Sequence, residues 1–269
     1  MQVYRGLDIG TAKATPAMQD KVRHHLVDLV EPEHDLSVAE FQREGRAVLT
    51  RLTDTKTRPI VCGGSGLHFR SLVDPLEFPP SDMRLRSVLA DLGGTEARSR
   101  LLEIDPEAAA HVDLDNPRRV VRALEIAELT GEIPSQRAKT AEAAAVRGYR
   151  PLVSFVGVGL DPGDHLVERV ERRFDAMLAA GLLEEVPRLQ PRLGRSAGQA
   201  VGYKELLPVI AGEESIAAGR AAAIRATMAL AKRQRTFFRR DPRIEWITWD
   251  PDPKVRVGSA LRHLDEVLR

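Results

Sequence analysis

The sequence predicts an α/β protein in which a helical segment interrupts a core built from both ends of the chain. Strand-like runs alternate with helix-like segments through residues 1–80, the pattern of doubly wound sheets that bind ligands at the carboxyl ends of their strands. Residues 81–150 contain no strand-like run, and such runs return at 152–160 and 245–249. We therefore predict an α/β core of residues 1–80 and 151–269 and a helical insertion domain of residues 81–150.

Length and composition exclude several classes of protein. The chain has 269 residues, of which 43% are hydrophobic and 29% charged, a balance typical of packed globular domains rather than disordered tails. The longest nearly uninterrupted apolar run, residues 152–160, is too short to span a bilayer. The N-terminus has no apolar signal region, and the single Cys62 has no partner for an intramolecular disulfide. We expect a cytoplasmic protein that does not associate with membranes.

The first elements alternate between strand and helix. Residues 25–30 predict a strand. Ser37 and Glu40 have the spacing of a capping box, which predicts the start of the following helix. Residues 58–62 predict a short buried strand, and the glycine-rich turn 63–66 leads from it into another helix.

The later elements are mainly helical. Asn116 and Pro117 predict the cap and first residue of a helix, and Gly131 stands where a glycine commonly ends one. Two further helices are predicted at 163–180 and 215–240. The strands at 152–160 and 245–249 complete the core.

The net charge of +1 conceals a basic segment near the C-terminus. Between Arg220 and Arg243 there are eight basic side chains and one acidic side chain, Asp241. Most basic residues of the chain are arginines, whose planar guanidinium suits bidentate contact with phosphate, although a GC-rich genome would produce the same excess. The position of the basic residues is the stronger observation, and it favours a polyanionic partner.

Several familiar chemistries have no counterpart in the sequence. No CxxC, HExxH or comparable metal-binding spacing occurs. His24 and His25 are neighbours on a predicted strand and point to opposite faces, so we assign them structural roles. The turn 63–66 lacks the Gly-x-Ser-x-Gly spacing of a nucleophile elbow. Its three glycines and the helix that follows suit an anion site, and equally a tight turn in which Ser65 caps the helix.

Two helices carry pairs of arginines four residues apart. Arg118 and Arg122 share one helix face, and Arg169 and Arg173 share another. Like charges at this spacing repel each other, which indicates an anionic partner, although Arg118 and Arg122 also suit a solvated charged face. Arg169 and Arg173 follow a predicted strand and are placed to meet a phosphate, unless they pair with nearby glutamates, namely Glu168, Glu171, Glu184 and Glu185.

Seven motifs in a fixed order resemble the tRNA dimethylallyltransferase family, also called tRNA isopentenyltransferases. The resemblance extends from residue 1 to about residue 250. The motifs are residues 2–13 (QVYRGLDIGTAK), 24–28 (HHLVD), 63–67 (GGSGL), 116–125 (NPRRVVRALE), 177–186, 201–205 (VGYKE) and 231–236 (AKRQRT).

The resemblance implies both a fold and a reaction. The fold is a P-loop NTPase-like α/β core, of the nucleotide- and ATP-binding type, with a helical insertion that grips the anticodon stem-loop of tRNA. The reaction transfers a dimethylallyl group from dimethylallyl diphosphate to N6 of the adenosine next to the anticodon on its 3′ side. The target base is flipped out of its stack, a carboxylate removes the N6 proton, and lysine, arginine and Mg²⁺ stabilise the departing diphosphate. Family members are monomers.

The resemblance also implies roles for individual residues. Arg173 matches the arginine that binds the diphosphate, and the same role extends to Arg169. A second set matches positions that contact tRNA. This set consists of Gln2, Ser65, Arg86, Arg118, Arg119, Arg122 and, within the segment 201–204, Lys204. The basic segment of residues 220–243 would add salt-dependent affinity for the stem.

The chain departs from the family pattern in one respect. Family members carry a phosphate-binding loop, G-x-T-x-x-G-K-[ST], and then Asp-Ser-Met-Gln-Val-Tyr-Arg, and this chain starts at that Met. No G-x-x-x-x-G-K-[ST] occurs in the 269 residues, so the P-loop, its Mg²⁺-binding hydroxyl and the aspartate base are expected to be absent. We expect a start assigned to an internal Met, or a truncated form, and a chain that is catalytically inactive, with exposed apolar core surface and unpaired strand edges.

Two functions from other classes remain open at this point. A P-loop nucleotide kinase or related phosphotransferase would share the same core, but the motifs at 2–5 and 116–119 argue against it. A non-catalytic tRNA-binding protein would need only the arginine-bearing helices.

Overall fold

The computed structural model describes residues 1–268 and divides the chain into two compact units. Unit 1 consists of Met1–Leu72 together with Phe155 onward, and unit 2 consists of Val73–Ser154. These boundaries, at 72/73 and 154/155, replace the 80/81 and 150/151 expected from the sequence. Within the described chain, no helix is long and apolar enough to cross a membrane.

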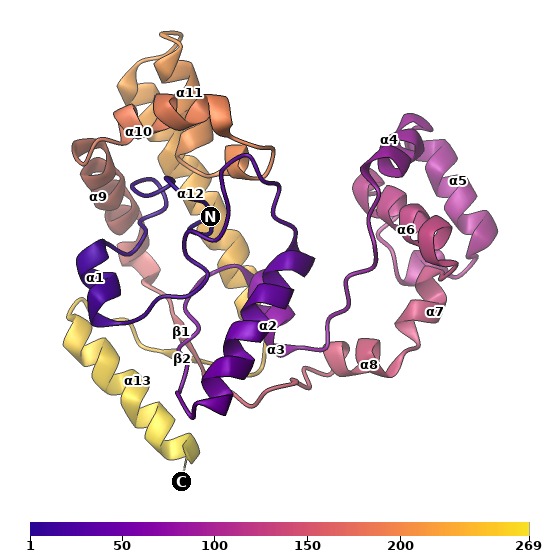
Figure 1. The fold of residues 1–269 in the computed structure, drawn as a ribbon, viewed down its shortest axis with the longest axis horizontal. Helices are drawn as coiled ribbons and strands as arrows, with labels where there is room; N and C mark the ends of the chain where they lie inside the picture. Colours follow the sequence, from indigo (N-terminus) through magenta and orange to yellow (C-terminus); the bar gives the residue numbers. More distant parts are fainter. Residues whose placement is uncertain (269) are drawn as a thin grey trace. The chain divides into compact units, whose positions relative to one another are not determined.

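Unit 1 is mostly helical (Figure 1). Helices α9, α10, α11 and α12 pack against one another, and α12 is the longest helix of the described chain. The N-terminal residues run past this group as irregular chain. The helices are α1 (Pro16–Lys21), α2 (Val38–Asp54), α3 (Gly66–Val73), α9 (Leu166–Ala179), α10 (Leu182–Leu189), α11 (Tyr203–Ile210), α12 (Ile216–Phe238) and α13 (Pro253–Leu268).

The sheet of unit 1 has two strands that are far apart in sequence. Strand β1 (Gly157–Leu160) pairs in parallel with β2 (Ile244–Ile247), so that Gly157 lies opposite Ile244 and Leu160 opposite Ile247. A parallel pair of this kind needs a long crossover connection. Here the crossover carries helices α9 to α12.

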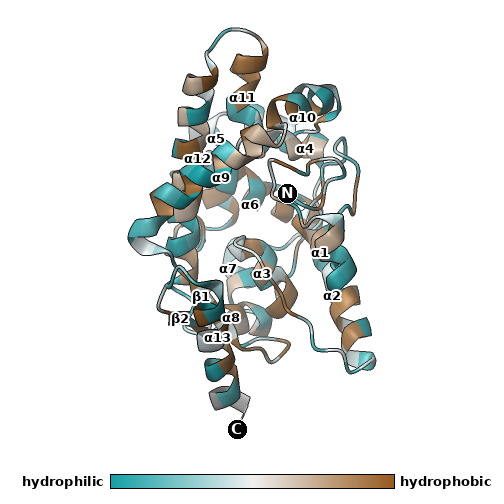
Figure 2. Cartoon of the chain, turned by 90° about the vertical axis from the view of Figure 1, so that its left-hand side faces the viewer, coloured by the Kyte–Doolittle hydropathy of each residue, from teal (hydrophilic) through white to brown (hydrophobic). Residues whose placement is uncertain are grey.

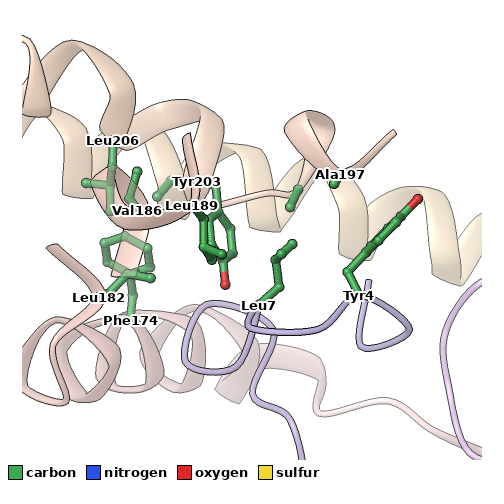
Figure 3. Packing of buried hydrophobic residues seen from close by; sticks show 11 residues of the cluster. Tyr4, Leu7, Phe174, Leu182, Val186, Leu189, Ala197, Tyr203 and Leu206 are labelled. Carbon is green, nitrogen blue, oxygen red and sulfur yellow. The ribbon is translucent and has the colours of Figure 1, made fainter. Parts of the chain in front are cut away.

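The largest core of unit 1 joins the N-terminal residues to helices α9 to α12. Leu7 and Tyr203 are fully buried there, and Tyr4 and Phe174 are nearly so. Figure 3 shows these side chains converging between the N-terminal loop and the helices. Burial of such large apolar side chains stabilises the fold by about 1.5–3 kcal/mol each.

Unit 2 consists of five helices, α4 (Met83–Asp91), α5 (Gly94–Ile104), α6 (Pro117–Thr130), α7 (Pro134–Ala138) and α8 (Ala141–Arg147). Helices α4, α5 and α6 pack pairwise around a second core of small and branched apolar residues. Leu101 and Leu124 are fully buried in it. Both units thus have apolar cores of their own.

Several helix ends predicted from the sequence are confirmed. Ser37 and Glu40 form a reciprocal capping box at the start of α2, a helix that presents both polar and apolar residues in Figure 2. Pro117 is the first residue of α6, and Gly131 ends that helix with a φ of 74°, a left-handed conformation that glycine adopts readily. Asn116 is at the N-cap, but its side chain makes no capping hydrogen bond.

The predicted strands are shorter than expected, and one of them is wrong. Residues 58–62 are exposed and form no strand. Residues 25–30 contribute a single parallel bridge, from Val30 to Tyr4, and only the second half of 152–160 becomes β1. A strand needs a neighbour to satisfy its backbone N–H and C=O groups, and no described segment pairs with 58–62.

Candidate functional site

The N-terminal loop, residues 6–13, is held against Gln2 and Tyr4. The Gln2 side-chain amide donates to the backbone oxygens of Thr11 and Ala12 at 3.0 Å each. The Thr11 hydroxyl donates to the backbone oxygen of Leu7 at 2.6 Å. Gln2, a residue predicted to contact tRNA, is thereby tied to one conformation of the loop.

Lys13, the last residue of this loop, bonds back to the loop and to neighbouring segments. Its ammonium group donates to the backbone oxygen of Tyr4 at 2.8 Å and to carboxylate oxygens of Asp8 and Asp28 at 2.6 Å each. The Lys13 side chain is only 5% exposed. A buried ammonium with all three donors used is a structural element, so Lys13 fixes the loop to the segment around residue 28.

Glu185 on helix α10 accepts hydrogen bonds from three successive amides of the loop. The backbone nitrogens of Asp8, Ile9 and Gly10 lie 2.9–3.2 Å from its carboxylate oxygens. The hydroxyl of Tyr203 donates to the same carboxylate. Glu185 and Tyr203 are both buried. Burial and the hydrogen bond to Glu185 raise the pKa of Tyr203 well above its usual value, so its hydroxyl remains a donor at all physiological pH values.

Helix α9 carries the two arginines predicted to bind diphosphate. The guanidinium of Arg169 lies 4.5 Å from the ring centroid of Trp249. Desolvation, and then repulsion by Arg169, lower the pKa of Arg173. Within the described residues neither arginine pairs with a glutamate. Glu168 pairs instead with Arg172, at 3.5 Å, so the predicted alternative of glutamate pairing does not apply to Arg169 and Arg173.

The basic residues of the segment 220–243 divide into two groups. Four form ion pairs within unit 1: Arg220 with Asp175, Arg235 and Arg239 with Asp161, and Arg243 with Asp241. The other four are exposed and make no ion pair with the described residues, and these are Arg225, Lys232, Arg233 and Arg240. About half of the positive charge of this segment is therefore available to an external anion.

The glycine-rich turn 63–66 packs closely against α12. A side chain at Gly64 would overlap Gln234, and one at Gly66 would overlap Phe237. Ser65 lies between them, and its hydroxyl is 2.7 Å from Nδ1 of His68. The tight-turn interpretation accounts for the glycines, and the hydroxyl of Ser65 bonds to a side chain of α3.

In unit 2, Arg86 and Arg122 converge on one buried carboxylate. Glu125 has no exposed side-chain surface, and its Oε2 accepts from Arg86 at 2.8 Å and from Arg122 at 2.6 Å. The Asp82 backbone nitrogen donates to its other oxygen at 2.8 Å. Arg122 also donates to the backbone oxygens of Pro79 and Pro80. These two arginines hold the chain that leads into α4 against α6.

The remaining predicted tRNA contacts are exposed. Arg118 makes no ion pair with the described residues, and Arg119 lies 3.4 Å from Asp113 in an exposed pair. Lys204 is exposed in the first turn of α11. Only Arg118, Arg119 and Lys204 among the predicted set therefore present largely free positive charge.

The described residues contain no cluster of His, Cys, Asp or Glu side chains suited to Mg²⁺. No group of three or more His, Cys, Asp or Glu side chains in this part of the chain could hold a metal ion. The carboxylates discussed above are occupied by lysine, arginine or backbone donors.

Sequence patterns missed several residues that organise the site. The sequence pattern treats Glu185 only as a possible partner for arginine and gives no individual role to Lys13, Asp161 or Trp249. Tyr203 falls within the segment 201–204 that is expected to contact tRNA, but the pattern does not indicate its bond to Glu185. One signal for Glu185 was present: it falls on the apolar stripe of α10 formed by Leu182, Val186 and Leu189. A carboxylate in such a stripe requires buried donors.

Comparison with known proteins agrees with this architecture. A family model described as IPP transferase matches residues 2–241. A tRNA dimethylallyltransferase of Bifidobacterium adolescentis is 41% identical over 98% of this chain and 78% of that protein. The full-length tRNA isopentenylpyrophosphate transferase of Bacillus halodurans is 33% identical, with a TM-score of 0.66 over 98% of this chain and 86% of that one. A eukaryotic dimethylallyltransferase acting on tRNA has a TM-score of 0.73 at 22% identity, over 96% of this chain and 69% of that one, which shows the fold.

The fold and the comparisons define a mixed α/β protein of the P-loop NTPase-like class, mostly helical, with a small parallel sheet. The fold class predicted from the sequence is confirmed. The chain belongs to the IPP transferase family.

The Glu125 cluster makes the stability of unit 2 dependent on pH. Burial tends to raise the pKa of Glu125, but hydrogen bonds from Arg122, Arg86 and the Asp82 amide hold it below its ordinary value of 4.5. A lowered folded-state pKa stabilises the fold fully above about pH 4.5, and that stability is lost as the pH falls through the folded-state pKa. Glu125→Gln should destabilise α4–α6 by about 2 kcal/mol at pH 7 and remove this acid dependence.

Hydrogen exchange of the amides in α4–α6, followed between pH 7 and pH 3.5, measures both effects. Glu128→Gln is the matched control, because Glu128 lies on the same helix in a half-exposed pair with Arg100 and should change stability by less than about 1 kcal/mol. Equal effects of the two substitutions at pH 7 would contradict the role assigned to Glu125.

Proposed function

We propose that this chain serves the transfer of a dimethylallyl group from dimethylallyl diphosphate to N6 of the adenosine that follows the anticodon of tRNA on its 3′ side. The observation that carries the proposal is the 41% identity, over 98% of the chain, to a protein named tRNA dimethylallyltransferase. The exposed arginines and lysine described above supply cationic side chains of the kind that contact phosphate. The protein would act as a monomer.

The reaction sets clear requirements on the protein. The lone pair of N6 attacks C1 of the dimethylallyl group, the C1–O bond breaks, and its electron pair leaves with the diphosphate. A base then takes the extra proton from N6. The protein must hold the adenine and the diphosphate in line and stabilise the negative charge that develops on the leaving group.

Arg173 and Arg169 would bind the diphosphate. Both lie on one face of α9, four residues apart, and no described carboxylate neutralises either of them. The lowered pKa of Arg173 reflects an unfavourable environment for its charge, which an anion would relieve. Trp249 limits the movement of Arg169 by stacking against its guanidinium.

Unit 2 and the N-terminal residues would bind tRNA. Arg118 and Arg119 present exposed guanidinium groups at the start of α6. Arg86 and Arg122 would contribute indirectly, by holding the chain before α4 against this helix. Gln2, Ser65 and Lys204 would contact the RNA from unit 1. The exposed basic residues of α12 and of the turn that follows it would add affinity for the stem, namely Arg225, Lys232, Arg233 and Arg240.

Mg²⁺ is part of this proposal only through the family resemblance. No group of three or more His, Cys, Asp or Glu side chains among the described residues could hold it. The cation would therefore reach the site with the diphosphate, whose oxygens are the ligands Mg²⁺ prefers.

Transfer by the 269-residue chain alone is the first test. We expect no turnover, because the 269 residues contain no G-x-x-x-x-G-K-[ST] motif and the carboxylates around the N-terminal loop, Asp8, Asp28 and Glu185, already accept from lysine, tyrosine or backbone donors. Incorporation of a labelled dimethylallyl group into an anticodon stem-loop RNA measures this, with the Bifidobacterium relative as positive control. RNA-dependent turnover would contradict the expected inactivity. Phosphate transfer from ATP without prenyl transfer would instead favour a nucleotide kinase.

Diphosphate binding tests the role of Arg173. Arg173→Gln should weaken binding of inorganic pyrophosphate by at least about tenfold, because a charge-assisted hydrogen bond contributes about 1.5–3 kcal/mol. Isothermal titration calorimetry measures the dissociation constant. Arg172→Gln is the control, since Arg172 is exposed and already pairs with Glu168, and it should leave binding within about twofold. Equal losses in both variants would rule out a specific role for Arg173.

Salt dependence tests the RNA contacts of unit 2. Replacing Arg118 and Arg119 together by Gln should weaken binding of the stem-loop and lower the slope of log K against log salt by about one to two. The control replaces Arg98 and Arg100, two arginines of α5 that pair with Asp115 and Glu128. Fluorescence anisotropy at several salt concentrations gives both slopes. An unchanged slope in the Arg118 and Arg119 variant would place the RNA elsewhere.

A further inference from the structure

A hydrogen-bond network centred on the buried Glu185 joins two segments of unit 1 that are distant in sequence. One is the N-terminal loop, residues 6–13, with Gln2 beside it. The other is the start of α11, where residues 201–204 precede and open the helix. Figure 3 shows the Tyr203 side chain pointing from α11 toward the loop that carries Leu7. Glu185 lies at the junction, because it accepts from Tyr203 and from three loop amides.

The chemistry of this junction requires a carboxylate. Four donors converge on two oxygens, and a buried donor left without an acceptor costs about 1–3 kcal/mol. A glutamine at position 185 would have one oxygen, and its amide N–H groups would face the N–H groups of the loop. Glu185→Gln therefore preserves shape while removing at least one acceptor and adding donors where donors already converge.

Close packing keeps the loop in a single position on this carboxylate. A Cβ on Gly10 would overlap the ring of Tyr203, so the loop backbone lies directly against α11. On its other side the loop is tied by Lys13 to Asp8 and Asp28. The amides of residues 8–10 and the carbonyls of residues 11 and 12 are thus fixed together.

The carbonyls at the end of this loop are the ones that hold Gln2. Its side-chain nitrogen donates to Thr11 and Ala12, which leaves its side-chain oxygen facing away from these bonds. A continuous path of hydrogen bonds and backbone therefore leads from Tyr203 through Glu185 and the loop to Gln2. Both ends of this path are segments for which an RNA contact is proposed.

We propose that Glu185 is a positioning residue for RNA binding: it sets Gln2 in register with the segment 201–204 so that both contact the anticodon stem-loop together. This inference rests on the proposed function. It assigns a role to a residue that does not itself touch the RNA. Glu185 acts through the loop amides, so its replacement would change the position of Gln2.

A double-mutant cycle tests the proposal on the intact chain. The variants are Glu185→Gln, Gln2→Ala and their combination, with Glu184→Gln as a control that removes the same charge from an exposed neighbour on α10. The dissociation constant of an anticodon stem-loop RNA is measured for each. Glu185→Gln should weaken binding by about tenfold in the parent chain and by less than about twofold in the Gln2→Ala background. Glu184→Gln should have no effect in either background.

Other outcomes overturn the proposal. Equal weakening by Glu185→Gln in both backgrounds would mean that the residue acts only on overall stability. If Glu185→Gln does not fold, Tyr203→Phe replaces it in the cycle, since it removes one donor and keeps the carboxylate. RNA binding by the parent chain together with unaltered binding by these variants would overturn the inference and leave the proposed function intact.

A measurement without RNA tests the positioning role of Glu185 separately from the proposed function. Hydrogen exchange at the amides of residues 8–10 should quicken by at least about tenfold in Glu185→Gln and stay unchanged in Glu184→Gln. Unchanged protection in Glu185→Gln would overturn the positioning role whatever the RNA result. Faster exchange in Glu185→Gln, together with a parent chain that binds no stem-loop RNA, would refute the proposed function and leave the positioning of the loop by Glu185 intact.

Discussion

The carboxylate of Glu185 is the interaction on which the N-terminal part of unit 1 depends. The loop of residues 6–13 belongs to no helix or strand, so its amides have no partners in regular secondary structure. Buried amides need acceptors, and a carboxylate offers two oxygens that can accept several donors at once. Once these bonds form, Leu7 is held against Tyr203, and the main core of unit 1 can close around them.

Unit 2 also contains a buried carboxylate that accepts several hydrogen bonds. Glu125 is buried in helix α6 and accepts from Arg86, Arg122 and a backbone amide. In both units a buried carboxylate on a helix accepts from backbone amides outside regular secondary structure, at residues 8–10 in unit 1 and at Asp82 in unit 2. The consequence for function is indirect. Arg86 and Arg122 are used in holding the chain before α4 against α6, whereas Arg118 and Arg119 keep exposed guanidinium groups.

The helices were predictable because their signals are local. The capping box of Ser37 and Glu40 and the terminal Gly131 act within one turn of the backbone, so spacing in the sequence is enough to identify them. Strands depend on partners elsewhere in the chain. Residues 58–62 have the composition of a buried strand, yet no described segment pairs with them, and they lie exposed as irregular chain. Composition alone carries no information about a missing neighbour.

The residue types and spacing of the candidate site could be predicted from the sequence. Which of its charges are neutralised by ion pairs within the protein could not. Spacing correctly placed Arg169 and Arg173 on one face of α9, and the basic segment 220–243 was visible as a count of charges. That count treated all eight cations as equal. Asp161, which directly follows β1, neutralises two of them, although it lies more than 70 positions away in sequence. The potential at the protein surface therefore depends on the tertiary fold, and the cations available to RNA are those that the fold leaves without a carboxylate.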